Sequence, residues 1–226
     1  MAKYLIVSEK TWHQKLVNEL CDEFPDHTFA LVNRKEDFNL DYIKEFGPEK
    51  IFIPHWSYMI DASIYNVYNC IVFHMTDLPF GRGGSPLQNL IVNGFSTTKI
   101  SALKVVEELD AGPIYIKQEL SLLGTAQEIF LRAADIIGIM ISKIIRNNPI
   151  PIEQVGEKVL FKRRKPSESK IQDIESISKL YDLIRMLDAE GYPKAFVEIG
   201  EFKIEFSRAS IKSDKEIIAD VRIFKK

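Results

Sequence analysis

The sequence predicts an α/β protein: a mostly parallel sheet with helices on both faces, followed by a small α+β appendage. Three observations indicate this class. Short apolar runs alternate with helical patterns over roughly the first 150 residues, which is typical of parallel sheets. The composition changes after Asn147, where Pro149, Pro151 and the basic run from Lys162 to Lys165 form a connector. A helical pattern and two alternating segments complete the chain.

The first part of the chain contains six predicted strands, each a short apolar run. They cover residues 4–7, 28–32, 50–53, 70–73, 98–106 and 113–120. Helical spacing predicts four helices between and after them. Two begin at the capping boxes Thr11-x-x-Gln14 and Thr125-x-x-Glu128, and the others cover residues 37–46 and 86–92. Ser85 and Pro86 suit the N-cap and first turn of the helix at 86–92, which Gly94 ends.

The pattern in the final part of the chain predicts a smaller second domain. A helical pattern covers residues 174–187, and two alternating segments at 195–206 and 217–224 indicate strands. No internal repeat or low-complexity segment interrupts the pattern. The sizes therefore predict two domains, one at residues 1–150 and the other, with its linker, at residues 151–226.

Composition excludes several classes of protein. Apolar residues make up 46% and charged residues 27%, the balance of an ordinary globular protein. The net charge of −2 gives no electrostatic argument for a nucleic-acid partner. Cys21 and Cys70 lack ligand spacing, so we expect neither a disulfide framework nor a metal site. No signal-peptide pattern is visible, and the most apolar stretch, residues 133–145, is about half the length of a membrane span. We expect a cytoplasmic protein without membrane contact.

Polar residues follow the ends of several predicted strands, which is where ligands bind in open parallel sheets. His55-Trp56-Ser57 follows the third strand, and His74 follows the fourth. The Gly-rich turn at residues 81–86 comes soon after His74, and Asp110 lies between the last two strands. Each feature alone also fits a structural role: a histidine that caps a carbonyl, an aspartate in a turn, or a flexible glycine-rich loop. Their combination is what points to a function.

Two segments carry a resemblance to a known family. Residues 73–86, FHMTDLPFGRGGSP, resemble the signature loop of folate-dependent formyltransferases of the methionyl-tRNA formyltransferase-like kind. Residues 109–114, LDAGPI, resemble the family's second signature. The resemblance covers residues 1 to about 150 and continues through residues 163–166 and 192–196. It implies a formyltransferase-type, Rossmann-like catalytic domain at residues 1–150, then a linker and a small C-terminal domain at residues 151–226.

The resemblance implies that His74 and Asp110 are catalytic. Formyl transfer needs a group that takes the proton of the attacking amine, and a donor that stabilises negative charge on the formyl oxygen. A carboxylate beside an imidazole makes the ring a stronger base and fixes its orientation. The two side chains are therefore expected to act as one acid–base pair.

One position departs from the family pattern. The family has an asparagine two residues before the histidine, and Val72 stands there in this chain, without a hydrogen-bond donor. Either a nearby group supplies the missing donor, for which His55, Ser57 and Thr76 are candidates, or the chain binds ligand without turnover. We expect the first, because the other site residues match the family.

The resemblance also implies where the substrates bind, with N10-formyltetrahydrofolate as the co-substrate and no metal. A pterin pocket made largely by backbone is expected near Tyr58, Met59, Ile60, Glu108 and Leu109, with Leu78 on its flank. The acceptor is expected along Met75, Thr76 and the turn at Gly84. Lys10 and Arg82 are candidates to meet its phosphates, since cations suit phosphate, although both also fit solvated surface charges.

The family formylates three classes of amine: initiator methionyl-tRNA, glycinamide ribonucleotide, and amino sugars on nucleotide carriers. The short appendage and the net charge of −2 disfavour tRNA, and the ribonucleotide enzymes usually lack such an appendage. Residues 53–57 and 73–91 look most like sugar N-formyltransferases of cell-surface glycan pathways. The expected acceptor is therefore a nucleotide-linked 4-amino-4,6-dideoxy sugar, with UDP as the carrier, as in pathways of the pseudaminic-acid type.

Other functions stay open at this point. The chain could formylate methionyl-tRNA instead, act as a silent regulator that binds folate or nucleotide, or release formate as a hydrolase. A homodimer is expected, because the alternating apolar side chains of residues 196–206 lie on a stretch too short to bury them alone. They are expected to pack on the helix at 174–187, on the main domain or on a second copy.

Overall fold

The computed structural model describes residues 1–226, and the chain folds into two compact units that interleave along the sequence. The first unit contains residues 1–82, 99–120 and 131–160. The second contains residues 83–98, 121–130 and 161–226. The division into functional domains at residue 150 is a different kind of boundary, and it stays a prediction.

The first unit is built around a six-stranded sheet with the strand order β2-β1-β3-β4-β6-β7. Its strands are β1 (Lys3–Ser8), β2 (Thr28–Val32), β3 (Lys50–His55), β4 (Cys70–His74), β6 (Thr97–Lys104) and β7 (Ile114–Ser121). Strand β1 pairs in parallel with β2 and β3, and β3 pairs in parallel with β4. Strand β6 is antiparallel to β4. The mostly parallel sheet and all six predicted strands are thereby confirmed, with ends that differ by one or two residues.

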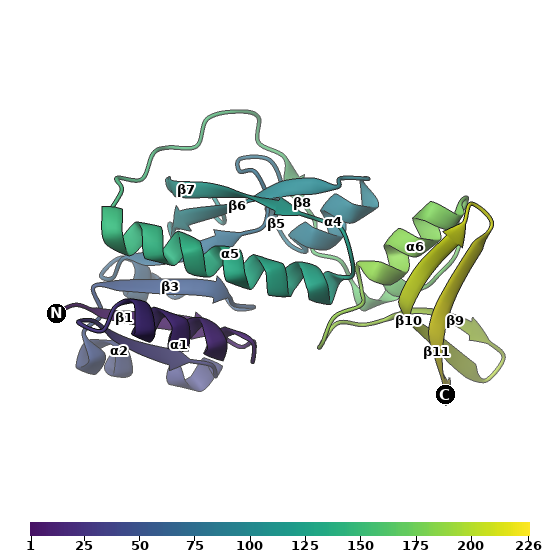
Figure 1. The fold of residues 1–226 in the computed structure, drawn as a ribbon, viewed down its shortest axis with the longest axis horizontal. Coiled ribbons are helices and arrows are strands. Elements are labelled where there is room, and N and C mark those ends of the chain that lie inside the picture. The colour runs from purple at the N-terminus through teal and green to yellow at the C-terminus, as the bar shows by residue number, and fades with distance from the viewer. The chain divides into compact units, whose positions relative to one another are not determined.

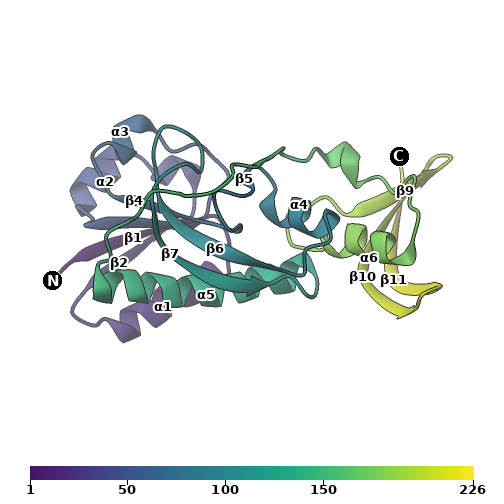
Figure 2. The same ribbon diagram turned by 90° about the horizontal axis from the view of Figure 1, so that it is seen from above.

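Helices cover both faces of this sheet, as the sequence predicts (Figures 1 and 2). The helices α1 (His13–Glu23) and α5 (Ala126–Asn147) lie on one face, while α2 (Leu40–Phe46) and the short α3 (Ala62–Tyr65) lie on the other. A 3-10 turn at Lys35–Asp37 precedes α2. Under α2 and α3, an apolar cluster joins the helices to the strands through Leu5, Val7, Val32, Ile43, Ile51, Ile53, Ile64 and Cys70.

The helix caps agree only in part with the sequence. At α5 the predicted capping box is present, because Thr125 N donates to Glu128 Oε2 over 2.7 Å and Glu128 N donates to Thr125 Oγ1 over 3.3 Å. The capping box at Thr11 is wrong: α1 begins at His13 after Trp12, which provides no side-chain cap. The reason is local, since the Gln14 side chain donates forward to Asn18 Oδ1 and does not reach back.

The second unit contains two helices and a three-stranded antiparallel sheet, which confirms the predicted α+β appendage. The helices are α4 (Pro86–Val92) and α6 (Ile177–Arg185), and the sheet order is β11-β10-β9. Its strands are β9 (Ala195–Ile199), β10 (Phe202–Ser213) and β11 (Glu216–Lys225). Helix α6 packs on β10, and α4 joins it through Gln88 Nε2, which donates to Met186 O over 3.1 Å.

Short elements complete the chain. Strand β5 (Arg82–Gly83) pairs with β8 (Leu160–Phe161), and a 3-10 turn covers Pro166–Ser169. Pro86 occupies the first turn of α4 as predicted, but Ser85 does not cap the helix. Its hydroxyl accepts a hydrogen bond from Arg164 N over 3.1 Å instead. The basic connector is therefore fixed against the start of α4 within the second unit.

The three-stranded sheet buries only part of its apolar surface. Ala195 is fully buried, whereas Ile199, Phe202, Val221 and Ile223 stay exposed. The strand register places these exposed residues on one face of the sheet. The expected homodimer stays a prediction. None of the helices combines the length and the apolar character that crossing a bilayer requires.

Candidate active site

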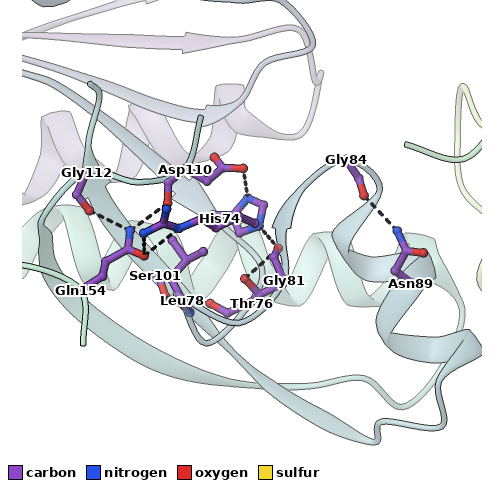
Figure 3. A network of polar contacts seen from close by, with 11 residues as sticks. His74, Thr76, Leu78, Gly81, Gly84, Asn89, Ser101, Asp110, Gly112 and Gln154 are labelled. Carbon is purple, nitrogen blue, oxygen red and sulfur yellow. Dashed lines mark hydrogen bonds and ion pairs between the residues drawn. The ribbon is translucent and has the colours of Figure 1, made fainter. Parts of the chain in front are cut away.

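His74 is the last residue of β4, and its imidazole lies between a backbone carbonyl and a carboxylate (Figure 3). The Nε2 atom is 2.8 Å from Gly81 O. Because a carbonyl oxygen only accepts hydrogen bonds, Nε2 carries a hydrogen and donates it. The other ring nitrogen, Nδ1, is 3.5 Å from Asp110 Oδ2. The side chains of His74 and Asp110 are only 9% and 11% exposed, so the pair that the sequence singled out does come together.

The contact between Nδ1 and Asp110 is the part of this pair that can gain or lose a proton. With Nε2 committed to Gly81, an arriving proton binds at Nδ1 or at the carboxyl group. On Nδ1 that proton converts a contact between two lone pairs into an ion pair, and on the carboxyl group it forms an O–H···N hydrogen bond between neutral groups. The arrangement suits a general base that takes a proton from a nucleophile and later returns it.

The backbone around Asp110 is tightly constrained. Asp110 has φ 54°, in the left-handed region that aspartate tolerates better than most residues. Two residues later, a Cβ on Gly112 would lie 1.8 Å from Lys104 O. Lys104 N donates to Pro113 O over 2.9 Å at the same place. The turn is thus pressed onto the end of β6, which fixes the direction of the aspartate side chain.

The loop after His74 is held from two sides. Ser101 on β6 donates through its hydroxyl to Thr76 O over 2.7 Å and accepts from Leu78 N over 3.4 Å. Further along, Gly81 N donates to Val159 O over 2.9 Å. The carbonyl that orients His74 therefore belongs to a residue whose own amide is anchored.

Three residues expected to touch the acceptor are buried in the structure. Met75, Thr76 and Arg82 are almost inaccessible, and the Thr76 hydroxyl donates to Gly81 O over 3.4 Å. The Arg82 guanidinium donates to Gln154 and Glu108. A contact between these side chains and an acceptor phosphate would require them to leave their partners. The geometry favours a structural role for Arg82 in the loop.

The other two residues expected at the acceptor lie in different units. Lys10 precedes α1 in the first unit, with Nζ 5.6 Å from the centroid of the Trp12 ring. Gly84 belongs to the second unit, where a Cβ would lie 2.5 Å from Arg163 Cβ. This close approach is sufficient to explain why position 84 is a glycine, and no contact with a ligand is needed for it. It also brings the basic connector against the Gly-rich turn.

A cavity of about 420 Å³ lies in the first unit next to the residues expected to hold folate. Its walls come from α3 and the loop after β6: Ala62, Tyr65, Asn66, Lys104, Val105, Val106 and Glu107. The expected residues adjoin these walls along the chain. Tyr58, Met59 and Ile60 precede α3, and Glu108 and Leu109 follow Glu107. Leu78, in contrast, is 1% exposed and lies in the core.

The three candidates for the missing donor differ in their surroundings. Ser57 is exposed, and the Thr76 hydroxyl already points to Gly81 O. His55 is half-buried at the end of β3, paired in register with Ser8. Burial, and to a lesser extent the charge of Lys10, lowers the pKa of His55 to about 4. At neutral pH it is therefore an uncharged imidazole with one N–H to donate.

Val72 and His55 lie on neighbouring strands. Ile53 on β3 is paired in parallel with Val72 on β4. The paired register of β3 and β4 ends at Ile53 and Val72. Strand β3 then shifts its register against β1 by one residue before His55, which pairs with Ser8. Val72 itself packs against the apolar cluster under α2 and α3, which explains how a valine is accommodated at this position.

Sequence reasoning missed two groups of polar residues. Gln154, in the connector after α5, donates through Nε2 to Asp110 O and Gly112 O. No motif marks it, and it lies 44 residues from Asp110. The second group is a buried pair in which Ser8 Oγ is 2.6 Å from His13 Nδ1. Two polar residues five apart, at a strand end and a helix start, were a weak signal for it. No cluster of three or more His, Cys, Asp or Glu side chains suits a metal ion.

Comparison with known proteins identifies the family. Residues 166–224 match the family model of the methionyl-tRNA formyltransferase C-terminal domain. A solved structure of methionyl-tRNA formyltransferase from Clostridium thermocellum is 45% identical, covers 100% of each chain and superimposes with a TM-score of 0.97. This chain belongs to the formyltransferase family. Within the family it is methionyl-tRNA formyltransferase-like.

Other family members resemble the chain over part of their length. Methionyl-tRNA formyltransferase of Thermodesulfovibrio yellowstonii is 26% identical over 159 residues, which are 67% of this chain and 52% of that protein. The chain thus spans about half the length of this curated relative. The matched part determines the family, and the activity of the whole protein is a matter for proposal.

More distant solved structures share the formyltransferase fold. HypX from Aquifex aeolicus in complex with tetrahydrofolic acid has a TM-score of 0.76 at 16% identity, over 92% of this chain and 38% of that one. A sugar N-formyltransferase from Shewanella sp FDAARGOS_354 has a TM-score of 0.67 at 19% identity, over 88% and 93% of the two chains. At these identities the likeness concerns the fold alone.

Proposed function

We propose that this chain transfers a formyl group from N10-formyltetrahydrofolate to a primary amine. The observation that carries the proposal is the buried His74–Asp110 pair: His74 ends β4 at the carboxyl edge of the parallel strands, with one ring nitrogen fixed and the other facing a carboxylate. Ligands of open α/β sheets bind at this edge. The family membership of the chain supplies the reaction class.

The chain's own residues suit the steps of this reaction. The folate supplies the formyl group, and its N10 nitrogen takes up a proton when its bond to the formyl carbon breaks. Asp110 and His74 Nδ1 take the proton that the attacking amine loses, and they return it to the departing nitrogen. A neutral His55 donates a hydrogen bond to the formyl oxygen as its negative charge develops, in place of the family's asparagine.

The cavity between α3 and the loop after β6 supports folate binding. Its volume of about 420 Å³ falls within the range of small-molecule sites. Its lining mixes apolar side chains, Ala62, Val105 and Val106, with the amide of Asn66 and the backbone before Asp110. Such a lining suits a flat heterocycle with polar edges. Glu107, the last of the lining residues in the sequence, comes three residues before Asp110.

We infer that the acceptor is methionyl-tRNA, which the sequence alone disfavoured. The 45% identical relative and the matched C-terminal domain both carry that enzyme's name. The net charge of −2 concealed an uneven distribution, because residues 161–226 carry more Lys and Arg than Asp and Glu. A locally basic surface is what a phosphate backbone requires. The nucleotide-sugar acceptor now rests on the resemblance of short segments alone.

The basic connector supports this choice of acceptor. Asn89 Nδ2 donates to Lys162 O over 3.0 Å, and Arg164 N donates to Ser85 Oγ over 3.1 Å. These bonds hold the connector's backbone, while the side chains of Lys162, Arg163 and Lys165 are exposed. A fixed backbone that presents exposed cationic side chains suits contact with phosphates better than it suits the role of a flexible linker.

One assay tests donor and acceptor together. Purified protein is mixed with N10-formyltetrahydrofolate and with methionyl-tRNA, a UDP-linked 4-amino-4,6-dideoxy sugar, or no acceptor. We expect formylmethionyl-tRNA in the first mixture only. Formylated sugar alone would restore the nucleotide-sugar acceptor. Formate without acceptor would indicate a hydrolase, and folate binding without any product would indicate a regulator.

A further inference from the structure

We infer that Gln154 is the positioning residue of Asp110, and that Arg82 holds Gln154 in place for this role. The inference deepens the proposed function and rests on it for its catalytic meaning. Neither residue touches the reacting atoms. Gln154 would act through the backbone of the aspartate, and Arg82 would act through Gln154.

The Gln154 amide group joins two carbonyls on either side of the catalytic turn (Figure 3). Its Nε2 atom donates to Asp110 O over 2.8 Å and to Gly112 O over 2.9 Å. A side-chain amide has two N–H donors, so both are used on the turn. The two bonds span Ala111 and fix the backbone from which the Asp110 side chain projects toward His74.

Arg82 determines which way the Gln154 amide points. Its Nε and Nη2 atoms donate to Gln154 Oε1 over 3.1 and 2.8 Å, and Nη1 donates to Glu108 Oε1 over 2.9 Å. A guanidinium group cannot accept a hydrogen bond, so the oxygen of the amide must face Arg82 and its NH₂ group must face the turn. With Arg82 only 3% exposed, these charge-assisted bonds are protected from water.

The turn needs such support because its conformation is costly. Asp110 has φ 54°, in the left-handed region, which steric crowding of the Cβ disfavours for residues other than glycine. The connector is itself anchored two residues earlier, where Ile152 and Ile114 exchange backbone hydrogen bonds of 2.8 and 2.9 Å. Gln154 therefore extends from a fixed backbone and is not carried by a free loop.

The contacts form a closed ring that includes both catalytic residues. His74 donates to Gly81 O, and Arg82, the residue after Gly81, donates to the Gln154 side chain. Gln154 in turn donates to Asp110 O, and the Asp110 side chain faces His74. A shift of the Gln154 amide would change the distance between Asp110 and His74. This is the physical route by which a residue without substrate contact affects turnover.

The test removes the N–H donors of Gln154 and keeps the approximate size of its side chain. Gln154→Met removes the whole amide, and Gln154→Glu keeps an acceptor for Arg82 but loses both donors. Gln14→Met, on the exposed side of α1, is the matched control. We expect both Gln154 variants to lower kcat by about 10-fold, the usual scale for a partner that orients a reactive group, with the control unchanged. Should Gln154→Met fail to fold, Gln154→Glu carries the same test.

Two readouts separate positioning from a general structural role. In a double-mutant cycle, Gln154→Met added to Asp110→Asn should cause little further loss, because the first acts through the second. The ¹⁵N signals of the His74 ring should change in Gln154→Met in the same direction as in Asp110→Asn. Additive losses in kcat, or an unmoved His74 signal, would overturn the inference. If the wild type transfers no formyl group, the proposed function fails, while the His74 signal still decides whether Gln154 positions Asp110.

Discussion

At the scale of single residues, the sequence singled out the His74–Asp110 pair but not the residues that hold it in place. His74 and Asp110 lie in short motifs, so their types and positions could be predicted. The burial of Arg82 could not be predicted, because a glycine-rich loop gives no sign that its cation is 3% exposed; its contact with acceptor phosphates stays a prediction. Gln154 is invisible in the same way, since a lone glutamine in a connector carries no pattern and meets Asp110 only in the folded chain.

The first prediction concerns His55 and the valine at position 72. His55→Leu should lower kcat by about 100-fold, the scale for one lost donor to a developing oxyanion, with little change in folate affinity. Adding Val72→Asn to that variant should restore part of the loss. Ser57→Ala, at an exposed position of the same loop, tests a rival candidate and should leave kcat unchanged. Normal turnover in His55→Leu would show that another group stabilises the oxygen.

At the scale of elements, periodicity predicted the strands and helices well wherever side chains alternate or recur along one face. The apolar runs of β1, β3 and β4 are fully or largely buried, so their pattern is simple. The alternation over residues 195–206 concealed a turn, because Gly200, with φ 56°, separates β9 from β10 without breaking the alternation strongly. The two-residue strands β5 and β8 depend on pairing across the chain, which no local pattern contains.

The second prediction concerns the turn between β6 and β7. Gly112→Ala should place a methyl group against Lys104 O, where an ideal Cβ would be only 1.8 Å away, so the turn must move. We expect a loss of several kcal/mol in unfolding free energy, or a folded protein with at least 10-fold lower kcat. Gly94→Ala is the control, since a Cβ there meets nothing within 4 Å and the change costs about 1–2 kcal/mol of backbone strain alone. Equal effects in urea unfolding would contradict the steric account.

At the scale of the whole molecule, the net charge weighed against methionyl-tRNA as the acceptor because it averages over two unlike parts of the chain. The total of −2 is accurate, but the positive part contains the connector that packs against the Gly-rich turn. The basic run from Lys162 to Lys165 is evident in the sequence. Its packing partner was the missing information, and only the folded second unit provides it.

The third prediction concerns acid stability. Burial, together with the charges of His55 and Lys10, lowers the pKa of His13 to about 3, from an ordinary value of 6.5. Below pH 6.5 the unfolded chain binds a proton that folded His13 refuses, so the free energy of unfolding should fall as pH decreases. The expected slope is about 1.4 kcal/mol per pH unit from this residue.

Urea unfolding of the wild type and of His13→Gln between pH 7.5 and 5 checks this slope. The variant should show the shallower pH dependence, whatever its absolute stability, because it lacks the proton-binding group. Identical slopes would mean that folded His13 takes up its proton as readily as the unfolded chain does.

The measurement that tests the central claim most directly is single-turnover formyl transfer by the wild type and by Asp110→Asn. Both proteins are saturated with N10-formyltetrahydrofolate, their folate affinities are measured separately, and methionyl-tRNA is added. Asparagine keeps the size of the side chain but has no negative charge to stabilise a proton on His74 Nδ1. We therefore expect unchanged folate affinity and a transfer rate lower by about 100-fold or more. Equal transfer rates in the two proteins would contradict the assignment of the His74–Asp110 pair as the catalytic base.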